Sequence, residues 1–308
     1  MKLYQNVLIG LRWKQWTIHE AFAYFSKGVA RELKIAPVFF GNYYNKVLVN
    51  TFTKEWLKKD TNPAYFDIKG AKLPYTPDKP NIIAELAGFM FEDCFTILTR
   101  FNDCYDKSIV EQVDQWMKDG PYGYTDGKFD VTIKQGDVVI DAGAWIGDFS
   151  AYVALKGAQC YAFEPLKDNY DILLKTVQLN NSQIIPVQKG LGSSEGNINI
   201  SVNGAGSSYI MEGDGDSGEE TISITTLDKF VEENNLKKID FIKADIEGAE
   251  RDMLKGATHV LKTFAPKLAI CTYHFPEDPE LLEKIIKEAN PDYTVKHLQH
   301  KLFAEVIK

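Results

Sequence analysis

Two glycines and two carboxylates near the middle of the chain are spaced as in a nucleoside-binding site. Asp141 and Gly143 end one apolar run, and Glu164 ends the next, 23 residues after Asp141. Gly143 permits a close approach that a Cβ would block, and Gly147 lets a helix start against the strand with its N–H groups facing a ligand. Glu164 can accept hydrogen bonds from both hydroxyls of a ribose, which contribute about 1.5–3 kcal/mol as charge-assisted bonds.

The residues between the two glycines decide which nucleoside is expected. A dinucleotide-binding loop has a further glycine there, so that the backbone can approach a pyrophosphate. Here Ala144, Trp145 and Ile146 are bulky. S-adenosylmethionine carries no phosphate, and Asp141 could meet the ammonium of its amino-acid tail directly or through water. We therefore expect S-adenosylmethionine at a site formed by Asp141, Gly143, Ala144, Trp145, Gly147, Glu164, Pro165 and Asp245.

Other interpretations of these residues remain open from the sequence. Asp141 alone could cap a turn, and Glu164 alone could be an exposed acid at a strand end. The combination with two glycines favours the cofactor site. The competing functions are an NAD-dependent oxidoreductase on a Rossmann-like fold and a non-catalytic, cofactor-binding member of a polysaccharide-assembly complex.

A second group of polar residues suits the removal of a proton from a hydroxyl. Asp245 and Glu247 follow one apolar run and His274 follows another. Histidine titrates near neutral pH, so His274 is the expected general base, with Asp245 and Glu247 as further catalytic candidates. These carboxylates could also hold a divalent cation, although the sequence predicts no metal site. Alternatively, Asp245 contacts the cofactor while Glu247 and Glu250 cap the next helix.

The elements that must position these residues alternate between strands and helices from Phe129 onward. Such alternation predicts an α/β, doubly wound sheet with helices on both faces. The expected strands are Val138–Ala142, Cys160–Phe163, Ile184–Val187, Ile239–Lys243, Leu268–Tyr273 and the edge strands Thr294–Leu298 and Leu302–Ile307. The expected helices are Ile146–Leu155, Leu166–Leu179, Glu250–Leu261 and Leu281–Ala289, and a Gly-rich β-hairpin insertion is expected between Gly190 and Glu220.

The N-terminal region has a different character. Residues 1–120 are predicted to be mixed and mainly helical, with helices at 21–33 and 108–117, and to select substrate or mediate oligomerisation. Four prolines between Asn62 and Pro80 predict a loop or lid. Residues 121–308 form the expected cofactor-binding domain. Tyr122 and Tyr124 could border the cofactor pocket, although packing of a turn is the simpler interpretation.

The charge distribution and the cysteines indicate which classes of partner and which cellular compartment to expect. The net charge of −8 divides into +1 over residues 1–130 (17 Lys+Arg, 16 Asp+Glu) and −9 over the remainder (18 and 27). An acidic C-terminal half argues against nucleic-acid binding. Four dispersed cysteines and the lack of a long apolar run predict a cytoplasmic protein without a membrane span. The expected partners are a small-molecule or glycan acceptor and, as an open option, further copies of the chain.

Four motifs in order resemble the FkbM-type methyltransferases. They are Asp141–Ser150 (DAGAWIGDFS), Tyr161–Pro165 (YAFEP), Ile224–Asp228 (ITTLD) and Ile239–Glu250 (IDFIKADIEGAE). The resemblance covers roughly residues 120–275. It implies a class I methyltransferase (Rossmann-like) fold and, most commonly, O-methylation of sugars or other natural-product hydroxyls.

The resemblance also implies roles for individual residues. Asp141, Gly143, Gly147 and Glu164 match cofactor-binding positions, and the segment from Asp245 to Glu250 matches the block beside the active site. Trp145 stands where the family usually has asparagine. The first 110 or so residues have no counterpart.

Overall fold

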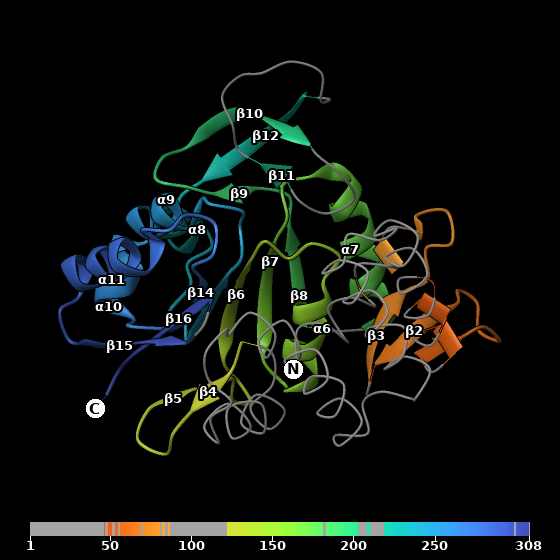
Figure 1. The fold of residues 1–308 in the computed structure, drawn as a ribbon, viewed down its shortest axis with the longest axis horizontal. Coiled ribbons are helices and arrows are strands. Elements are labelled where there is room, and N and C mark those ends of the chain that lie inside the picture. The colour runs from red at the N-terminus through yellow and green to blue at the C-terminus, as the bar shows by residue number, and fades with distance from the viewer. Residues whose placement is uncertain are drawn as a thin grey trace, which may run out of the picture. The chain divides into compact units, whose positions relative to one another are not determined.

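The computed structural model describes residues 56–68, 70–80, 122–180, 183–202, 208–209, 219–298 and 300–307, with scattered positions between 46 and 86 (Figure 1). Two compact units are present: Met1–Asp67 with Tyr75–Val113, and Ile68–Pro74 with Asp114–Lys308. The helices expected at 21–33 and 108–117 lie outside the described residues. The boundary at residues 120 and 121 therefore stays a prediction.

The segment from Asn62 to Pro80 contains strands, so the expectation of a loop or lid was wrong. In the first unit, β1 (Leu57–Lys58) pairs antiparallel with β2 (Tyr65–Ile68), and Phe66 of β2 is buried edge-on against Tyr75. In the second unit, β3 (Ala71–Pro74) contains a proline only at its last residue and buries Leu73. Proline disrupts a strand only where its missing N–H is needed in the ladder, and here Pro63 and Pro74 lie at or beyond strand ends.

The second unit is built on a seven-stranded sheet. Its strand order is β15-β16-β14-β13-β6-β7-β8. The five strands from β14 to β8 run parallel to one another, and β16 runs antiparallel to both β14 and β15. The bounds are β6 Val138–Ala142, β7 Gln159–Phe163, β8 Ile184–Val187, β13 Phe241–Ala244, β14 Lys267–Cys271, β15 Tyr293–Leu298 and β16 Lys301–Val306. The expected doubly wound, class I fold is confirmed, but Leu302–Ile307 lies inside the sheet rather than at its edge.

The apolar strands form the centre of the sheet because both of their faces are covered. Val139 and Phe241 point to one face and Ile140 and Ile242 to the other, and all four are completely buried. Burying each such side chain contributes about 1.5–3 kcal/mol. Continuous apolar runs of this kind are typical of parallel strands that lie between two helix layers.

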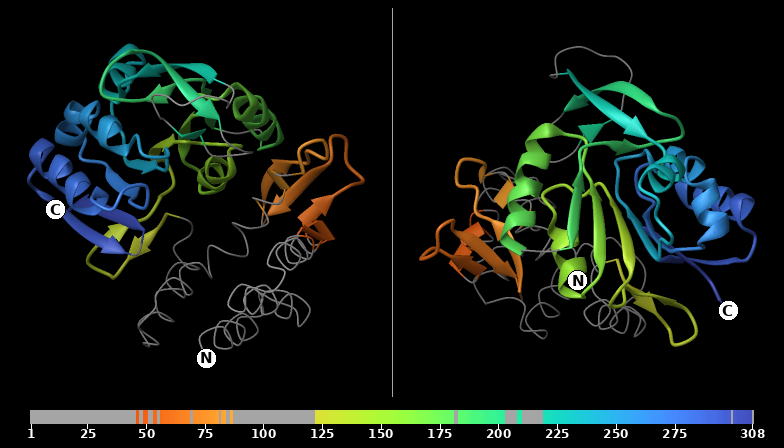
Figure 2. Two further views of the ribbon diagram at one scale, coloured as in Figure 1. Left: turned by 45° about the horizontal axis from the view of Figure 1, so that its top comes forward. Right: turned by 180° about the vertical axis from the view of Figure 1, so that it is seen from behind.

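Six helices of the described chain form those two layers (Figure 2). Helices α6 and α7 cover the face of Val139, through Phe149 and Leu173. The other four cover the face of Ile140. The bounds are α6 Asp148–Leu155, α7 Lys167–Asn180, α8 Leu227–Glu233, α9 Glu250–Lys255, α10 Thr258–Thr263 and α11 Asp278–Ala289. None of the described helices is long and apolar enough to cross a membrane.

The single helix expected over Glu250–Leu261 is two helices, α9 and α10. The chain turns at Gly256, where an added Cβ would lie 2.0 Å from the carbonyl oxygen of Gly192. Two backbones meet at this point, and only a residue without a side chain allows the contact. The helical periodicity was right, but the tertiary contact divides the helix.

The Gly-rich insertion contains the expected hairpin. Strands β10 (Gly196–Val202) and β12 (Glu219–Thr225) pair antiparallel, with Asn199 opposite Thr221. With β9 (Gly190–Leu191) and β11 (Ser208–Tyr209) they form a separate four-stranded sheet, which follows directly from the C-terminal end of β8 (Figure 1). Two smaller strands, β4 (Tyr124–Thr125) and β5 (Asp130–Val131), pair before β6.

Replacement of Gly256 tests the backbone contact that divides the helix. We expect Gly256→Ala to lower the free energy of unfolding by about 1–3 kcal/mol, because the added methyl group overpacks the junction with Gly192. Urea denaturation followed by circular dichroism measures this. Gly196→Ala is the matched control, since a Cβ there meets no atom within 4 Å. Equal stability of the two variants would contradict the prediction.

Candidate active site

The expected site residues gather at the C-terminal ends of β6, β7, β13 and β14. The chain runs from β6 through β7 to β8 in one direction and then returns to β13 on the other side of β6. In open α/β sheets, ligands bind in the crevice at such a reversal of strand order. The turn after β6 and the loop after β13 therefore form the two walls of this crevice.

The turn after β6 leans over the end of β7. The N–H groups of Gly143 and Ala144 both donate to the carbonyl oxygen of Phe163, at 3.0 and 2.8 Å. Gly143 has a φ of +76°, and a Cβ there would lie 2.0 Å from the carbonyl oxygen of Asp245. The close approach that requires glycine is thus made to the opposite wall of the crevice.

Gly147 has a different neighbour from the one expected. Its φ is +86°, and a Cβ there would lie 2.6 Å from Leu173 of α7. Gly147 therefore brings the start of α6 against α7, and not against the strand. The expected N–H groups at the start of α6 remain at the crevice end of the helix.

Glu164 lies directly beside the turn. Its carboxylate accepts hydrogen bonds from the N–H groups of Trp145 and Leu166, both at 3.0 Å, and only 5% of the residue is exposed. Burial raises the pKa of Glu164 to about 7, although the N–H groups of Leu166 and Trp145 oppose the rise. Trp145 itself has a φ of +48°, a left-handed conformation that is unfavourable for a residue with a side chain. Glu164 thus stabilises this turn by accepting the N–H of its strained residue, Trp145.

Asp141 is completely buried, which corrects the expectation of a direct contact with a cofactor tail. One carboxylate oxygen forms an ion pair with Lys243 Nζ at 3.0 Å, and the other accepts a hydrogen bond from Ser150 Oγ at 2.6 Å. Lys243 Nζ also donates to the carbonyl oxygens of Gly143 at 2.6 Å and Ala142 at 3.2 Å. Asp141 therefore acts on the turn through Lys243.

Lys243 is the residue that the sequence interpretation missed on this side. Burial opposes its charge, but Asp141 and Asp245 outweigh the burial and raise the pKa of Lys243. Its ammonium also lies 5.3 Å from the ring centroid of Tyr122. The signal was present, since a lysine inside an otherwise apolar, buried strand requires a partner of opposite charge.

Asp245 begins the opposite wall. Tyr122 and Tyr273 donate their hydroxyl groups to its two oxygens, at 2.8 and 2.7 Å. Burial favours the neutral acid, but Lys243 and the two hydroxyls prevail and lower the pKa of Asp245. Asp245 is therefore ionised at neutral pH. Tyr122 joins the site after all, whereas Tyr124 packs against Phe129 and Phe303.

The loop after Asp245 is closed by Glu250. Its carboxylate accepts the N–H groups of Ile246 at 2.8 Å and Gly248 at 3.0 Å, and the residue is completely buried. Glu247 has a φ of +55°, and a Cβ at Gly248 would lie 2.8 Å from the ring of Phe275. Glu250 thus holds the loop before α9, whose N-terminus has no side-chain cap, so the alternative in which Glu247 and Glu250 cap that helix was wrong. Glu247 projects its carboxylate toward His274.

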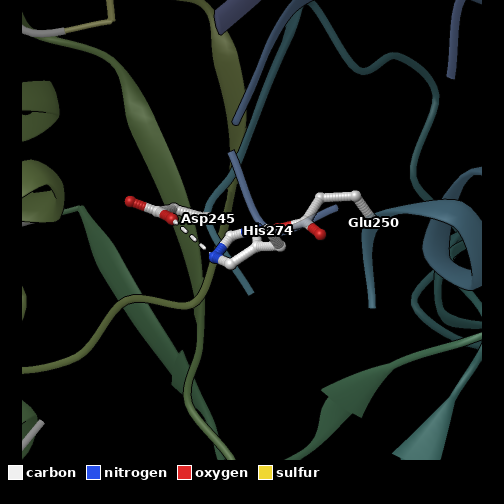
Figure 3. Close-up of side chains that lie close together, drawn as sticks. All are labelled: Asp245, Glu250 and His274. Carbon is white, nitrogen blue, oxygen red and sulfur yellow. Dashed lines mark ion pairs between the residues drawn. The ribbon is translucent and has the colours of Figure 1, made fainter. Parts of the chain in front are cut away.

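His274 lies among the carboxylates of Asp245, Glu247 and Glu250. Figure 3 draws two of them, Asp245 and Glu250, on either side of the imidazole ring. Its Nε2 is 3.3 Å from Glu247 and 4.0 Å from Asp245, and its Nδ1 is 3.3 Å from Glu250 on the opposite side of the ring. Burial opposes protonation, but contacts with Glu247 and Glu250 outweigh it and raise the pKa of His274 to about 10. The ring thus lies where positive charge is favoured, and the expected role of His274 as general base stays a prediction.

The structure therefore brings Asp245, Glu247 and His274 together, as expected. It adds Glu250 and Tyr273, which the sequence did not assign to the site. Tyr273 directly precedes His274, and the centroids of their two rings are 4.1 Å apart. Its hydroxyl contact spans 28 residues, and nothing in the local pattern predicts it.

Comparison with known proteins is consistent with this geometry. Residues 141–294, half of the chain, match the methyltransferase FkbM domain. The chain belongs to the FkbM methyltransferase family. The matched range begins at Asp141 and includes both walls of the crevice.

Individual relatives share about 30% of their residues with this chain over the aligned region. The hexuronic acid methyltransferase AglP of Haloferax volcanii is 31% identical over 161 residues, which cover 51% of this chain and 64% of the relative. Methyltransferase sdnD of Sordaria araneosa is 30% identical over 169 residues, covering 43% and 65%. A crystal structure of methyltransferase FkbM from Methylobacillus flagellatus KT aligns at 18% identity with a TM-score of 0.47, covering 85% and 58%. The chain thus spans just under two thirds of the length of both curated relatives.

The buried ion pair generates a stability prediction. Lys243→Met leaves Asp141 charged and unpaired in the interior, so we expect a loss of about 3–5 kcal/mol in the free energy of unfolding. Urea denaturation measures the loss, and the double variant with Asp141→Asn should recover part of it. Lys238→Met is the control, because its half-exposed pair with Asp240 contributes about 0–1 kcal/mol. Similar losses in both lysine variants would refute the argument.

Proposed function

We propose that the chain transfers a methyl group from S-adenosylmethionine to a hydroxyl group of a sugar. One observation carries the proposal. Glu164 lies within 3.0 Å of the Trp145 N–H on one wall of the crevice, and the acidic cluster around His274 lies on the other wall. A ribose-binding acid thus faces a group of side chains suited to a hydroxyl.

The residues at the turn fit the adenosyl group. The carboxylate of Glu164 is buried at the end of β7, where it can exchange its contact with the Trp145 N–H for the ribose hydroxyls. Pro165 follows that acid in the chain, and Ala144 donates its N–H to Phe163, the residue before Glu164. Gly143 and Gly147 keep the turn compact. Asp141 contributes through Lys243, and Asp245 faces the same crevice. The bulk of Trp145 disfavours the pyrophosphate of NAD, the alternative cofactor.

The chemistry requires mainly alignment. Bound S-adenosylmethionine supplies a methyl group that its sulfonium already activates, and positioning of the acceptor can contribute about 7–11 kcal/mol of the barrier. Glu247 is the best-placed group to take the proton of the hydroxyl, because the two oxygens of Asp245 already accept the tyrosine hydroxyls. His274 holds the Glu247 carboxylate, and Asp245 orients the acceptor.

A uronic acid fits the surroundings of the cluster. Tyr273 and Phe275 are large, half-exposed side chains that offer apolar faces to a sugar ring. Lys301 Nζ lies 4.8 Å from the ring centroid of Tyr122 and can attract a sugar carboxylate. A relative at 31% identity is named a hexuronic acid methyltransferase, which supports this acceptor class. The cytoplasmic location stays a prediction.

Loss of Glu164 should weaken the cofactor. We expect Glu164→Ala to raise the Kd of S-adenosylhomocysteine by about 10- to 150-fold, because two charge-assisted hydrogen bonds contribute about 1.5–3 kcal/mol. Isothermal titration calorimetry measures the change. Asp171→Asn, which removes an exposed acid on the next helix, is the control. Binding that survives unchanged in Glu164→Ala would refute the site, and quenched NADH fluorescence on mixing would favour the oxidoreductase.

The raised pKa of Glu164 predicts a pH dependence of binding. The ionised carboxylate accepts the ribose hydroxyls, and with a pKa of about 7 roughly one tenth is ionised at pH 6 and nine tenths at pH 8. We therefore expect the Kd of S-adenosylhomocysteine to be roughly tenfold higher at pH 6 than at pH 8. Glu164→Gln should remove most of this dependence. A flat wild-type profile over this range would count against the prediction.

A further inference from the structure

We propose that Asp245, Glu247 and His274 form a binding site for one divalent cation of the Mn²⁺ type, with Glu250 as the carboxylate behind the histidine. The role of this cation rests on the proposed function, but its binding does not. The site lies in the crevice wall formed by the loops after β13 and β14.

The distances suit a single ion. A divalent cation about 2.0–2.2 Å from each ligand places two ligand atoms about 3 Å apart at a right angle and about 4.2 Å apart when opposite. His274 Nε2 lies 3.3 Å from Glu247 Oε2 and 4.0 Å from Asp245 Oδ1. Ligand atoms of Asp245 and His274 also lie within 4.8 Å of each other and of Glu250, the carboxylate that we place behind the imidazole ring.

The imidazole ring supplies a second observation. Only 5% of the His274 side chain is exposed, and within the described residues its Nε2 makes no hydrogen bond of good geometry and faces only the carboxylate oxygens of Glu247 and Asp245. Buried polar atoms nearly always have such a partner, and an ion is one reason for an exception. The Nε2 edge points toward Asp245 (Figure 3).

Glu250 fits the position behind a metal-bound histidine. Histidine ligands commonly donate their second N–H to a carboxylate, which fixes the tautomer and the ring orientation. Glu250 Oε1 lies 3.3 Å from Nδ1, and the N–H groups of Ile246 and Gly248 hold its carboxylate in place. The left-handed φ of Glu247 likewise keeps its carboxylate on the Nε2 side.

The ligand set indicates the class of metal. Carboxylate oxygens suit Mg²⁺, Ca²⁺ and Mn²⁺, and an imidazole nitrogen shifts the preference toward a transition metal. One nitrogen with two carboxylates therefore favours Mn²⁺ over Mg²⁺ and Ca²⁺. A bound cation would polarise the acceptor hydroxyl, whose proton then passes to the Glu247 oxygen that does not bind the metal.

Titration of the EDTA-treated full chain with MnCl₂, followed by electron paramagnetic resonance, tests the site. We expect saturable binding of one ion per chain, with tighter binding of Mn²⁺ than of Mg²⁺ or Ca²⁺ in competition. His274→Gln and Glu247→Gln should weaken binding at least about tenfold. Asp252→Asn, an exposed acid on the adjoining helix, should not change it.

A spin-echo measurement on wild-type protein avoids dependence on folded variants. Bound Mn²⁺ should show coupling to a directly ligated nitrogen, and its absence would overturn the proposal, as would unchanged binding in a folded His274→Gln variant. S-adenosylhomocysteine titrations on the same samples separate the two ideas. Mn²⁺ binding without S-adenosylhomocysteine binding supports the metal site and contradicts the proposed cofactor, and the reverse contradicts the metal site alone.

Discussion

The ion pair between Asp141 and Lys243 is the interaction on which the crevice depends. It joins the two strands that flank the reversal of strand order, and both partners are removed from water. A buried pair of this kind adds little net stability compared with apolar residues, but it is costly to break. Its contribution is positional, because the same ammonium holds the carbonyl oxygens of Ala142 and Gly143. The turn after β6 thus takes its shape from the strand on the other side of the crevice.

The two walls are stabilised in the same way. Each contains a non-glycine residue in a left-handed conformation, Trp145 in one and Glu247 in the other. Such residues cost about 1–3 kcal/mol each and persist only where the surroundings hold them. Glu164 accepts the Trp145 N–H, and Glu250 accepts the N–H groups on both sides of Glu247. Carboxylates that bind backbone groups therefore offset the strain of both loops.

The sequence predicts this fold well where the pattern is local. Alternating apolar runs located the strands of the main sheet to within two residues, because strands buried on both faces leave a clear signal. Local pattern did not reveal the break at Gly256 or the inner position of β16, since each depends on contacts distant in the chain. The strands between Asn62 and Pro80 pair with near neighbours, but their prolines favoured a loop. The candidate site followed the same division. Its residues could be named from motifs, but the burial of Asp141 and the raised pKa of His274 arise from neighbours that only folding supplies.

The meeting of Gly192 and Gly256 has a mechanical consequence. The base of the hairpin is clamped to the helix layer by that backbone contact and by the ion pair of Lys229 with Glu195. One face of the hairpin packs beside the end of β7, where Ile200 of β10 and Ile222 of β12 form a buried cluster with Leu166. Because its base is held by these contacts, the hairpin is not free to rotate as a rigid body about that base. Any displacement over the crevice has to come from bending along β10 and β12 themselves.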